Sequence, residues 1–280
     1  MKKIFVVGAG TMGLDIAQVF STAGYAVTVY DMTDAIIERS AARLEKGLAK
    51  RVEKGKLTEE EKARIIGGIV FTTQYDSAKE ADLVIEAIIE SAEVKKTVFR
   101  NLDGICPDGT VFATNTSSIS ITEIASATNR PDRCIGMHFF NPATVMKLVE
   151  VIRGMATSDE TFRAVYALAE DIGKTPVEVA EAPGFVVNRI LIPMINEAIG
   201  LVAEGVASPQ DIDTAMKLGA NHPMGPLALG DLVGLDVVLA IMDTIFNETK
   251  DSKYRAHPLL RKMVRAGRLG RKTGNGFYQY

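Results

Sequence analysis

KKIFVVGAGTMG, at residues 2–13, is the stretch of sequence that decides the fold. Residues 2–7 form a short apolar run that predicts a buried strand, and residues 12–23 follow with the apolar spacing of a helix. Residues 25–31, YAVTVYD, predict a second strand. Together they predict a βαβ unit of about 30 residues.

The turn between this strand and this helix carries Gly8, Gly10 and Gly13 in a G-x-G-x-x-G pattern. Such a turn suits a dinucleotide, because its glycines allow a tight turn, close approach to a pyrophosphate and close packing of helix on strand. The amino terminus of the helix adds N–H donors for the anion. Asp31, at the end of the second strand, can accept hydrogen bonds from ribose hydroxyls and would repel a 2′-phosphate, which favours NAD over NADP. The alternative is a glycine-rich turn without a ligand, with Asp31 only capping a turn at the end of the strand.

Further short β-rich runs follow along the first two thirds of the chain, at residues 69–73, 82–88, 110–114, 134–139, 148–152 and 175–180. Because helical patterns alternate with them, we expect an α/β, Rossmann-like fold with a mostly parallel sheet and helices on both faces. A helical hairpin is predicted at about 34–66. Gly55 can end its first helix, and Thr58 with Glu61 forms a capping box for the second.

The pattern changes near Ala182, beyond which no strand is expected until the last few residues. Helical patterns cover residues 185–204, 209–218, 226–247 and 255–266. We therefore expect an NAD-binding domain over residues 1–182 and an all-α domain over residues 183–280. This division agrees with the length, because 280 residues correspond to about two domains.

Composition excludes several classes of protein. Apolar residues make up 47% of the chain, which argues against a disordered protein. The net charge of −3 leaves no basic excess for nucleic acid. Two cysteines cannot build a disulfide-rich scaffold or a four-cysteine zinc site, and no metal is expected. No apolar run is long enough for a transmembrane helix and no export signal is recognised, so we expect a cytoplasmic protein.

One of the three histidines, His138, ends a predicted strand, where open α/β sheets bind ligands. Alcohol oxidation by NAD needs a base, and histidine exchanges protons near neutral pH. A buried structural histidine is an equal alternative at this point. Glu150 lies in an apolar strand, where an unpaired charge would be costly, and could orient the imidazole. Its alternative is a solvent-facing position on an edge strand. Asn115 and Ser117, after another strand, supply polar donors or else a helix cap and turn.

These motifs resemble those of the L-3-hydroxyacyl-CoA dehydrogenase family. The resemblance rests on residues 8–13, 115–118, 138–142, 147–151, 183–189, 211–216, 223–226, 234–236 and 270–278, and spans nearly the whole chain in order. The compact length is most similar to the bacterial 3-hydroxybutyryl-CoA dehydrogenases. The resemblance implies reversible NAD-dependent oxidation of a (3S)-3-hydroxyacyl-CoA, with a four-carbon acyl group, to the 3-oxoacyl-CoA.

The resemblance also implies roles for individual residues. His138 would be the general acid/base paired with Glu150, while Ser117 and Asn188 would bind the 3-oxygen and the acyl carbonyl, with Asn141 at the substrate site. The implied cofactor contacts are Gly8, Gly10, Thr11, Met12, Gly13, Asp31, Ala87, Glu90, Lys95 and Asn115. From the sequence alone, Glu90 and Lys95 are interpreted as solvated helix charges.

A row of lysines lies opposite the apolar stripe of the first hairpin helix, at positions 46, 50 and 54. The resemblance implies that this hairpin contacts the coenzyme A nucleotide, and Lys50 and Lys54 are the candidates for its phosphates. Lys46 and Lys56 are weaker candidates. The alternative is a charged solvent face, on which the interleaved Glu45 and Glu53 could pair with the lysines.

Two other functions stay open from the sequence. One is a dehydrogenase of a free 3-hydroxy acid on the same fold, and the other is a non-catalytic NAD-binding protein. Apolar faces on the helical domain, at Ile190–Ile199 and 226–247, also predict a homodimer through that domain, unless they pack on each other within one subunit.

Overall fold

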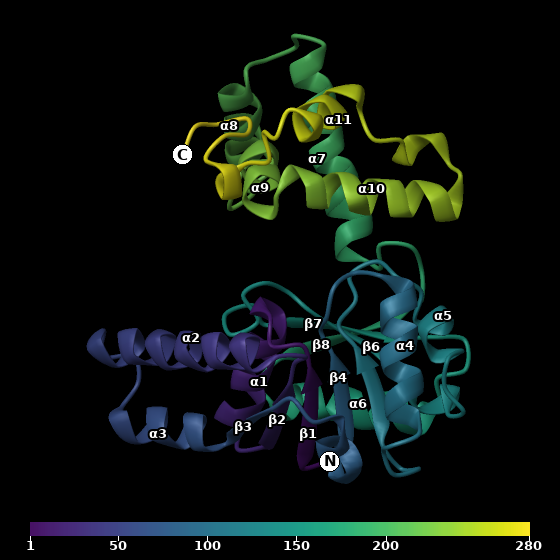
Figure 1. Ribbon diagram of the computed structural model, residues 1–280. Coiled ribbons are helices and arrows are strands. Elements are labelled where there is room, and N and C mark those ends of the chain that lie inside the picture. The colour runs from purple at the N-terminus through teal and green to yellow at the C-terminus, as the bar shows by residue number, and fades with distance from the viewer. The chain divides into compact units, whose positions relative to one another are not determined.

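The computed structural model describes all 280 residues, and its first part is built on one eight-stranded sheet (Figure 1). The strands are β1 (Lys3–Val7), β2 (Ala26–Tyr30), β3 (Ile69–Thr72), β4 (Leu83–Glu86), β5 (Val111–Thr114), β6 (Cys134–Phe139), β7 (Leu148–Arg153) and β8 (Thr175–Ala180). Their order is β3-β2-β1-β4-β5-β6-β7-β8. All neighbours pair in parallel except β6 and β7, so the expected mostly parallel sheet is confirmed.

Both faces of the sheet are covered, which explains why its central strands are continuously apolar. Successive side chains of β1 point to opposite faces, so Ile4 and Val6 join one hydrophobic cluster and Phe5 and Val7 the other. The first cluster includes α1 (Thr11–Thr22), α2 (Asp34–Glu53), α3 (Glu59–Gly67) and α6 (Asp159–Asp171). The second includes α4 (Ala92–Asp103) and α5 (Ile121–Ala125).

The expected helical hairpin consists of α2 and α3, which project together beside β3 (Figure 1). Leu44 and Leu48 bury the apolar stripe of α2 in the core. The turn between the helices uses Gly55 at φ +64°, a conformation that suits glycine. Thr58 and Glu61 form the predicted capping box at the start of α3.

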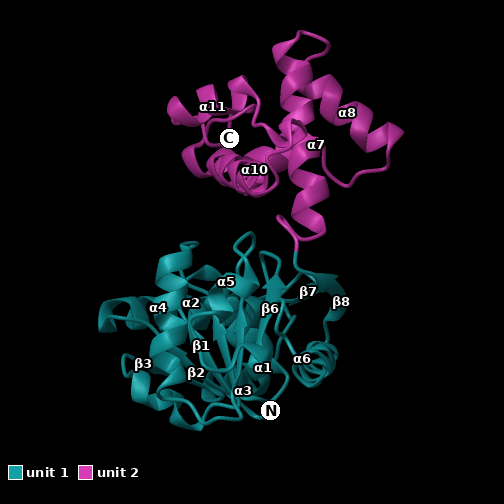
Figure 2. Ribbon diagram, turned by 90° about the vertical axis from the view of Figure 1, so that its right-hand side faces the viewer, with its two compact units in different colours: residues 1–181 teal, residues 182–280 magenta.

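The chain divides into two compact units, residues 1–181 and 182–280 (Figure 2). The second unit is helical, with α7 (Val187–Ala203), α8 (Pro209–Gly219), α9 (Pro226–Val233), α10 (Leu235–Thr249) and α11 (Pro258–Arg265) around its own core. Short 3₁₀ turns occur at Tyr75–Glu80, Pro131–Arg133, Ser252–Tyr254 and Arg271–Thr273. Only isolated bridges occur near the end, at residues 270–279. No helix has the length and apolar character needed to cross a membrane.

The prediction of one helix over residues 226–247 is wrong. Gly234 has φ +101°, and this single residue separates α9 from α10. A side chain there would be strained in that conformation, and its Cβ would lie 3.0 Å from Asp236 and 3.2 Å from Lys272. The apolar period continues across the break, so periodicity alone did not reveal it.

Candidate active site

The strand order reverses between β1 and β4, and in open α/β sheets ligands bind at such a point, beyond the carboxyl ends of the strands. The loop after β1 is the glycine-rich turn, and the loop after β4 holds Ala87 and Glu90. The carboxyl ends of β5 and β6 follow along the same edge, with Asn115 just beyond one and His138 near the end of the other. The sheet thus collects most of the residues that the sequence singled out.

The glycine-rich turn has the geometry that a bound pyrophosphate needs. Gly8 has φ +105°, and a Cβ there would lie 2.7 Å from the carbonyl oxygen of Ala87. A Cβ on Gly13 would lie 1.8 Å from the carbonyl oxygen of Gly8, so the start of α1 packs directly on the turn. A Cβ on Gly10 would have no atom within 4 Å. The turn is therefore closed on its protein side and open at Gly10, which suits close approach of a phosphate to the backbone.

The carboxylate of Asp31 lies against this turn. It accepts hydrogen bonds from the backbone N–H of Ala9 at 2.7 Å and of Met32 at 2.7 Å. Helix α2 also contacts the turn, since Ser40 donates to the carbonyl oxygen of Ala9 and Arg43 donates to that of Gly10. These contacts hold the turn and Asp31 in one fixed arrangement, which fits a dinucleotide.

His138 and Glu150 face each other across the antiparallel pair of β6 and β7. Their Nδ1 and Oε2 atoms are 2.7 Å apart, and the residues are only 6% and 0% exposed. Because β7 lies between β6 and β8, the alternative of Glu150 on a solvent-facing edge strand is wrong. A buried carboxylate bonded to one ring nitrogen fixes the orientation of the imidazole.

The other two histidines have different surroundings. His257 is the residue before α11, and its Nδ1 accepts the backbone N–H of Leu259. His222 lies in the loop before α9. His257 therefore caps a helix, and His138 is the histidine at the carboxyl edge of the sheet.

The turn after β5 is held by Glu90. Its Oε1 accepts hydrogen bonds from the hydroxyl of Thr116, from the N–H and hydroxyl of Ser117, and from the N–H and hydroxyl of Ser118. Asn115 contributes in a different way, because its Oδ1 accepts the N–H of Phe139 at 2.8 Å and so ties this turn to β6.

The interpretation of Lys95 as a solvated helix charge is wrong. Lys95 lies on α4 and is only 1% exposed, with its Nζ 2.7 Å from Glu86 and 3.3 Å from Glu90. Glu90 is not helical either, since it lies in the loop before α4. A charged side chain near a helix start usually faces solvent, and only the tertiary packing shows that this one does not.

Asn141 follows His138 in a loop with a cis peptide bond before Pro142. Asp15 on α1 accepts the N–H of Ala143, and Lys174 donates to carbonyl oxygens of the same loop. Burial raises the pKa of Asp15, although the N–H of Ala143 opposes this, and burial lowers the pKa of Lys174. The loop is thus fixed to the helix that follows the glycine-rich turn.

Two groups of predicted residues lie elsewhere in the chain. Asn188 is the second residue of α7 in the second unit. Lys50 is exposed on the last turn of α2 and Lys54 directly follows it, and the lysines at 46, 50, 54 and 56 make no ion pair with Glu45, Glu53 or any other carboxylate. The lysines thus lie on an exposed face of α2 without ion pairs, and both the phosphate contact and the charged solvent face stay open.

Three further residues hold this edge of the sheet together and were not predicted from the sequence: Glu86, Arg43 and Asp15. Glu86 ends a strand that reads as a continuous apolar run, and an acidic residue in such a run is the one signal that could have marked it. Arg43 and Asp15 carry no such signal, because charged residues on amphipathic helices are common.

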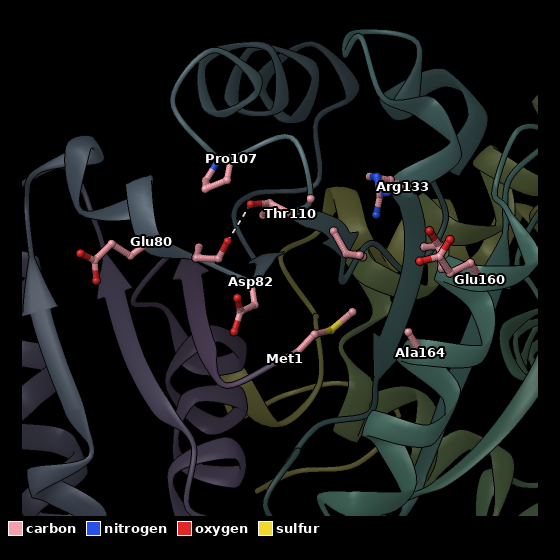
Figure 3. Close-up of a pocket in the computed structure, with 12 residues that line it drawn as sticks. Met1, Glu80, Asp82, Pro107, Thr110, Arg133, Glu160 and Ala164 are labelled. Carbon is pink, nitrogen blue, oxygen red and sulfur yellow. Dashed lines mark hydrogen bonds between the residues drawn. The ribbon is translucent and has the colours of Figure 1, made fainter.

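A cavity of about 310 Å³ lies at the opposite edge of the sheet (Figure 3). Asp82 and Thr110, which line it, immediately precede β4 and β5, so the cavity is at the amino ends of the strands. Arg133 and Glu160 lie on its other side (Figure 3). It contains none of the residues described above.

Comparison with known proteins agrees with this arrangement. Residues 3–182 match the family model described as 3-hydroxyacyl-CoA dehydrogenase, NAD binding domain, and residues 184–280 match its C-terminal domain. A 3-hydroxybutyryl-CoA dehydrogenase of Clostridioides difficile is 59% identical over 99% of both chains. The human mitochondrial hydroxyacyl-coenzyme A dehydrogenase is 44% identical over 100% of this chain and 91% of its own length.

A solved structure gives the same result. The (S)-3-hydroxybutyryl-CoA dehydrogenase of Ralstonia eutropha matches with a TM-score of 0.97 and 51% identity, over 100% of this chain and 99% of that one. The family models together cover almost every residue, and the relatives named here match over 91–99% of their own length. The chain therefore belongs to the family of NAD-dependent 3-hydroxyacyl-CoA dehydrogenases.

Proposed function

We propose that this protein interconverts (3S)-3-hydroxybutyryl-CoA and acetoacetyl-CoA, with His138 as the general acid/base. The observation that carries the proposal is the buried pair of His138 and Glu150 at the edge of the sheet that also holds the dinucleotide turn. The names of the bacterial relatives support the four-carbon substrate.

NAD supplies the hydride acceptor in the oxidation and the donor in the reverse reaction. The chain supplies the proton transfer. Glu150 is bonded to Nδ1 of His138, so we assign the proton exchange with the 3-oxygen of the substrate to Nε2. In oxidation the imidazole takes the hydroxyl proton, and Glu150 stabilises the imidazolium that forms. In reduction the imidazolium returns that proton.

Ser117 and Asn188 are the proposed donors to the substrate. A hydroxyl and an amide can hydrogen-bond the 3-oxygen and the thioester carbonyl, which orients the substrate and stabilises charge that develops on oxygen. The turn that carries Ser117 is fixed by Glu90, which supports this role. Asn141, in the loop after β6, is proposed to line the same substrate site.

The NAD contacts are proposed for the residues that form or adjoin the dinucleotide turn. The turn residues at 8 and 10–13 would hold the pyrophosphate, and Asp31 would accept from the ribose hydroxyls. Ala87, Glu90 and Asn115 adjoin the nicotinamide side through the loops after β4 and β5. Lys95, whose ammonium lies between Glu86 and Glu90, is proposed on the same side.

The first experiment follows the absorbance of NADH with acetoacetyl-CoA as substrate. The wild-type protein should oxidise NADH rapidly, and His138→Gln should lower kcat by about a thousandfold, within the usual range for a general acid/base. NADH binding, measured by its fluorescence, should persist in the variant. Binding without turnover in the wild type would contradict the proposal and leave a non-catalytic NAD-binding protein.

Two parallel assays separate the alternatives. Free acetoacetate should be a far poorer substrate than acetoacetyl-CoA, and equal rates would favour a dehydrogenase of a free 3-hydroxy acid. NADPH should be poorly used because the carboxylate of Asp31 repels a 2′-phosphate. Preference for NADPH would show that Asp31 does not select the cofactor.

Lys50 and Lys54 are proposed to bind the phosphates of the coenzyme A nucleotide, with Lys46 and Lys56 as secondary candidates. Their exposure and lack of ion pairs support this. The double change Lys50→Ala and Lys54→Ala should raise KM for acetoacetyl-CoA by about tenfold, while the pantetheine thioester, which lacks the nucleotide, should be unaffected. An equal effect on both thioesters would exclude a nucleotide contact.

We also propose a homodimer through residues 183–280. The apolar face expected on α7 is divided, since Ile195 and Ile199 are buried within the unit whereas Ile190 is 68% exposed. Leu218 and Val206 are exposed as well. Light scattering at low protein concentration should give twice the subunit mass, and a fully active monomer would contradict this.

Two free, buried cysteines support the proposed cytoplasmic location.

A further inference from the structure

The loop after β6, residues 140–147, is held by two charged side chains that come from other parts of the chain. Asp15 lies on the second turn of α1, and Lys174 lies between α6 and β8. Oδ2 of Asp15 accepts the N–H of Ala143 at 3.1 Å. Nζ of Lys174 donates to the carbonyl oxygen of Ala143 at 2.5 Å and to that of Met146 at 2.8 Å. The two backbone groups of one residue are therefore bound by opposite charges.

Ala143 needs such partners because it is 0% exposed and lies outside the strands of the sheet. A buried N–H or C=O group without a partner is costly, and hydrogen bonds to charged groups are stronger than those between neutral groups. The turn that follows is closed by the backbone, since Val145 and Met146 both donate to the carbonyl oxygen of Pro142 at 3.0 Å. Ala143 is thus the residue at which other elements fix this loop.

The two charges also support each other across the loop. Burial raises the pKa of Asp15, and the N–H of Ala143 is the largest opposing influence. The positive charges of Arg43 and Lys174 oppose the rise as well. Burial lowers the pKa of Lys174, and the charge of Asp15 opposes this. Removal of either side chain therefore disfavours the charged form of the other.

Fixing Ala143 restrains the residues that precede it. Asn141 lies only two residues earlier, and consecutive Cα atoms are at most about 3.8 Å apart. The ring of Phe140 lies against the imidazole of His138, with 4.5 Å between the ring centroids. On its other side the segment begins at the end of β6, which is paired with β5 and β7. The segment from His138 to Ala143 is therefore held at both ends.

We propose that Asp15 and Lys174 are positioning residues, a clamp that holds the loop and its Asn141 where the acyl group of the substrate is oriented for reaction. Both act through the loop, because their polar atoms bind its backbone groups. Since α1 begins at the dinucleotide turn, the clamp also keeps the loop in register with the part of the chain that is proposed to hold NAD. This inference rests on the proposed function, in which Asn141 lines the substrate site.

The test uses the variants Asp15→Ala and Lys174→Met and the double variant that combines them. Asp15→Asn is the conservative variant, because its Oδ1 can still accept an N–H. Gln18→Ala is the matched control on α1, since Gln18 is half-buried like Asp15 and lies about one turn further along the helix. Glu170→Gln, at an exposed position near the end of α6, is the control for Lys174. Circular dichroism and thermal unfolding establish that each variant is folded.

Steady-state kinetics separate positioning from cofactor binding. In Asp15→Ala and Lys174→Met, kcat/KM for acetoacetyl-CoA should fall about tenfold or more, because a small displacement of a positioning group is costly. The pantetheine thioester should show the same loss, since the clamp acts at the acyl end of the substrate. The Kd for NADH in every variant, and kcat/KM in Asp15→Asn and the two controls, should stay within about twofold of the wild type. Unchanged kcat/KM in Asp15→Ala, an equal loss in Asp15→Asn, or a loss confined to NADH binding would overturn the proposal.

The double variant shows whether the two residues act as one clamp. Both side chains hold Ala143, so the loss of the second should add little once the first is gone. We therefore expect kcat/KM of the double variant to be close to that of the less active single variant. Losses that multiply would show two independent structural supports and would contradict the clamp.

Hydrogen exchange tests the clamp without any turnover. The N–H of Ala143 donates to Asp15, so exchange of residues 141–146 in the ligand-free protein should be faster in Asp15→Ala and unchanged in Gln18→Ala. Unchanged exchange in Asp15→Ala would refute the clamp, whatever the activity. Faster exchange with normal kcat/KM would refute the positioning role. Faster exchange in Asp15→Ala together with no turnover of acetoacetyl-CoA by the wild type would refute the proposed function and leave the clamp.

Discussion

At the scale of single residues, the site depends on buried charges that have partners. Glu150 is fully buried and bonded to His138, and Lys95 is nearly fully buried between Glu86 and Glu90. Such groups are costly to desolvate and gain little net stability from pairing. Their position at the carboxyl edge of the sheet supports the proposal that they fix geometry for the chemistry there.

The change Glu150→Gln should lower kcat by about a hundredfold, because the amide cannot stabilise an imidazolium as a carboxylate does. The Kd for NADH should stay the same, since Glu150 lies away from the dinucleotide turn. Steady-state kinetics and NADH fluorescence measure the two quantities. Glu178→Gln, at an exposed position on the neighbouring strand, is the control and should have no effect. Full activity of Glu150→Gln would remove Glu150 from the mechanism.

The two cysteines should be unreactive in the folded protein. Burial raises the pKa of Cys106 to about 11 and that of Cys134 to about 12. At pH 8 the more acidic of the two would be a thiolate in only about one molecule in a thousand, and the thiolate is the form that reacts. Iodoacetamide should label neither cysteine in the native protein and both in denaturant. Rapid native labelling at pH 8 would contradict this burial.

At the scale of elements, the start of α1 and the end of β1 are joined by glycines that have different tasks. Gly13 has no room for a side chain because the backbone of Gly8 lies against it, whereas Gly10 faces open space. One glycine therefore serves the packing of the helix on the strand, and the other leaves open the side of the turn on which we propose that the pyrophosphate binds. The G-x-G-x-x-G motif does not distinguish these two tasks, because both positions are glycine.

These tasks separate in a matched pair of variants. Gly13→Ala should lower the free energy of unfolding by about 1–3 kcal/mol, because the methyl group overpacks the turn. Gly10→Ala should keep the stability of the wild type and raise the Kd for NADH by about tenfold or more, since the methyl lies where the pyrophosphate approaches. Denaturant unfolding and NADH fluorescence measure both. A stable Gly13→Ala with normal affinity would contradict the packing described.

At the scale of the whole molecule, each of the two units has its own hydrophobic core. In the second unit, Asp231 on α9 is buried and accepts the N–H groups of Phe277 and Tyr278 and the hydroxyl of Tyr280. One carboxylate thus holds the last residues of the chain against the helical core. Gly276 leaves space for the carboxylate of Asp231, since a Cβ on Gly276 would lie 2.1 Å from Oδ1 of Asp231.

The change Asp231→Asn should destabilise the second unit. The amide NH₂ would face a backbone N–H in place of an acceptor, and an unsatisfied buried donor costs about 1–3 kcal/mol. Calorimetry should show a lower unfolding temperature for the transition of this unit. Asp211→Asn, at an exposed position on α8, is the control. An unchanged thermogram would show that the carboxylate is not needed to hold the end of the chain.

Much of the α/β architecture could be predicted because its signals are local. The spacing of apolar residues, with period 2 in strands and 3.6 in helices, depends on residues close in sequence. The same is true of the capping box at Thr58 and of the glycines of the turn. The break at Gly234 could not be predicted, because an isolated glycine in an apolar helical pattern is also tolerated within a helix. Only the structure shows its φ of +101° and the atoms of Asp236 and Lys272 that a Cβ there would meet.

The sequence by itself determined the βαβ unit, the dinucleotide turn and the family resemblance, since these lie in contiguous motifs. Only the tertiary structure decided which polar residues are buried and with whom. His138 meets Glu150 because β7 runs antiparallel to β6, and Lys95 meets Glu86 because α4 packs on the strand before it. Two polar residues that pair across a large sequence separation leave no local pattern in the sequence. The cost of desolvating them, which makes the pairing necessary, arises only when packing removes water from around them.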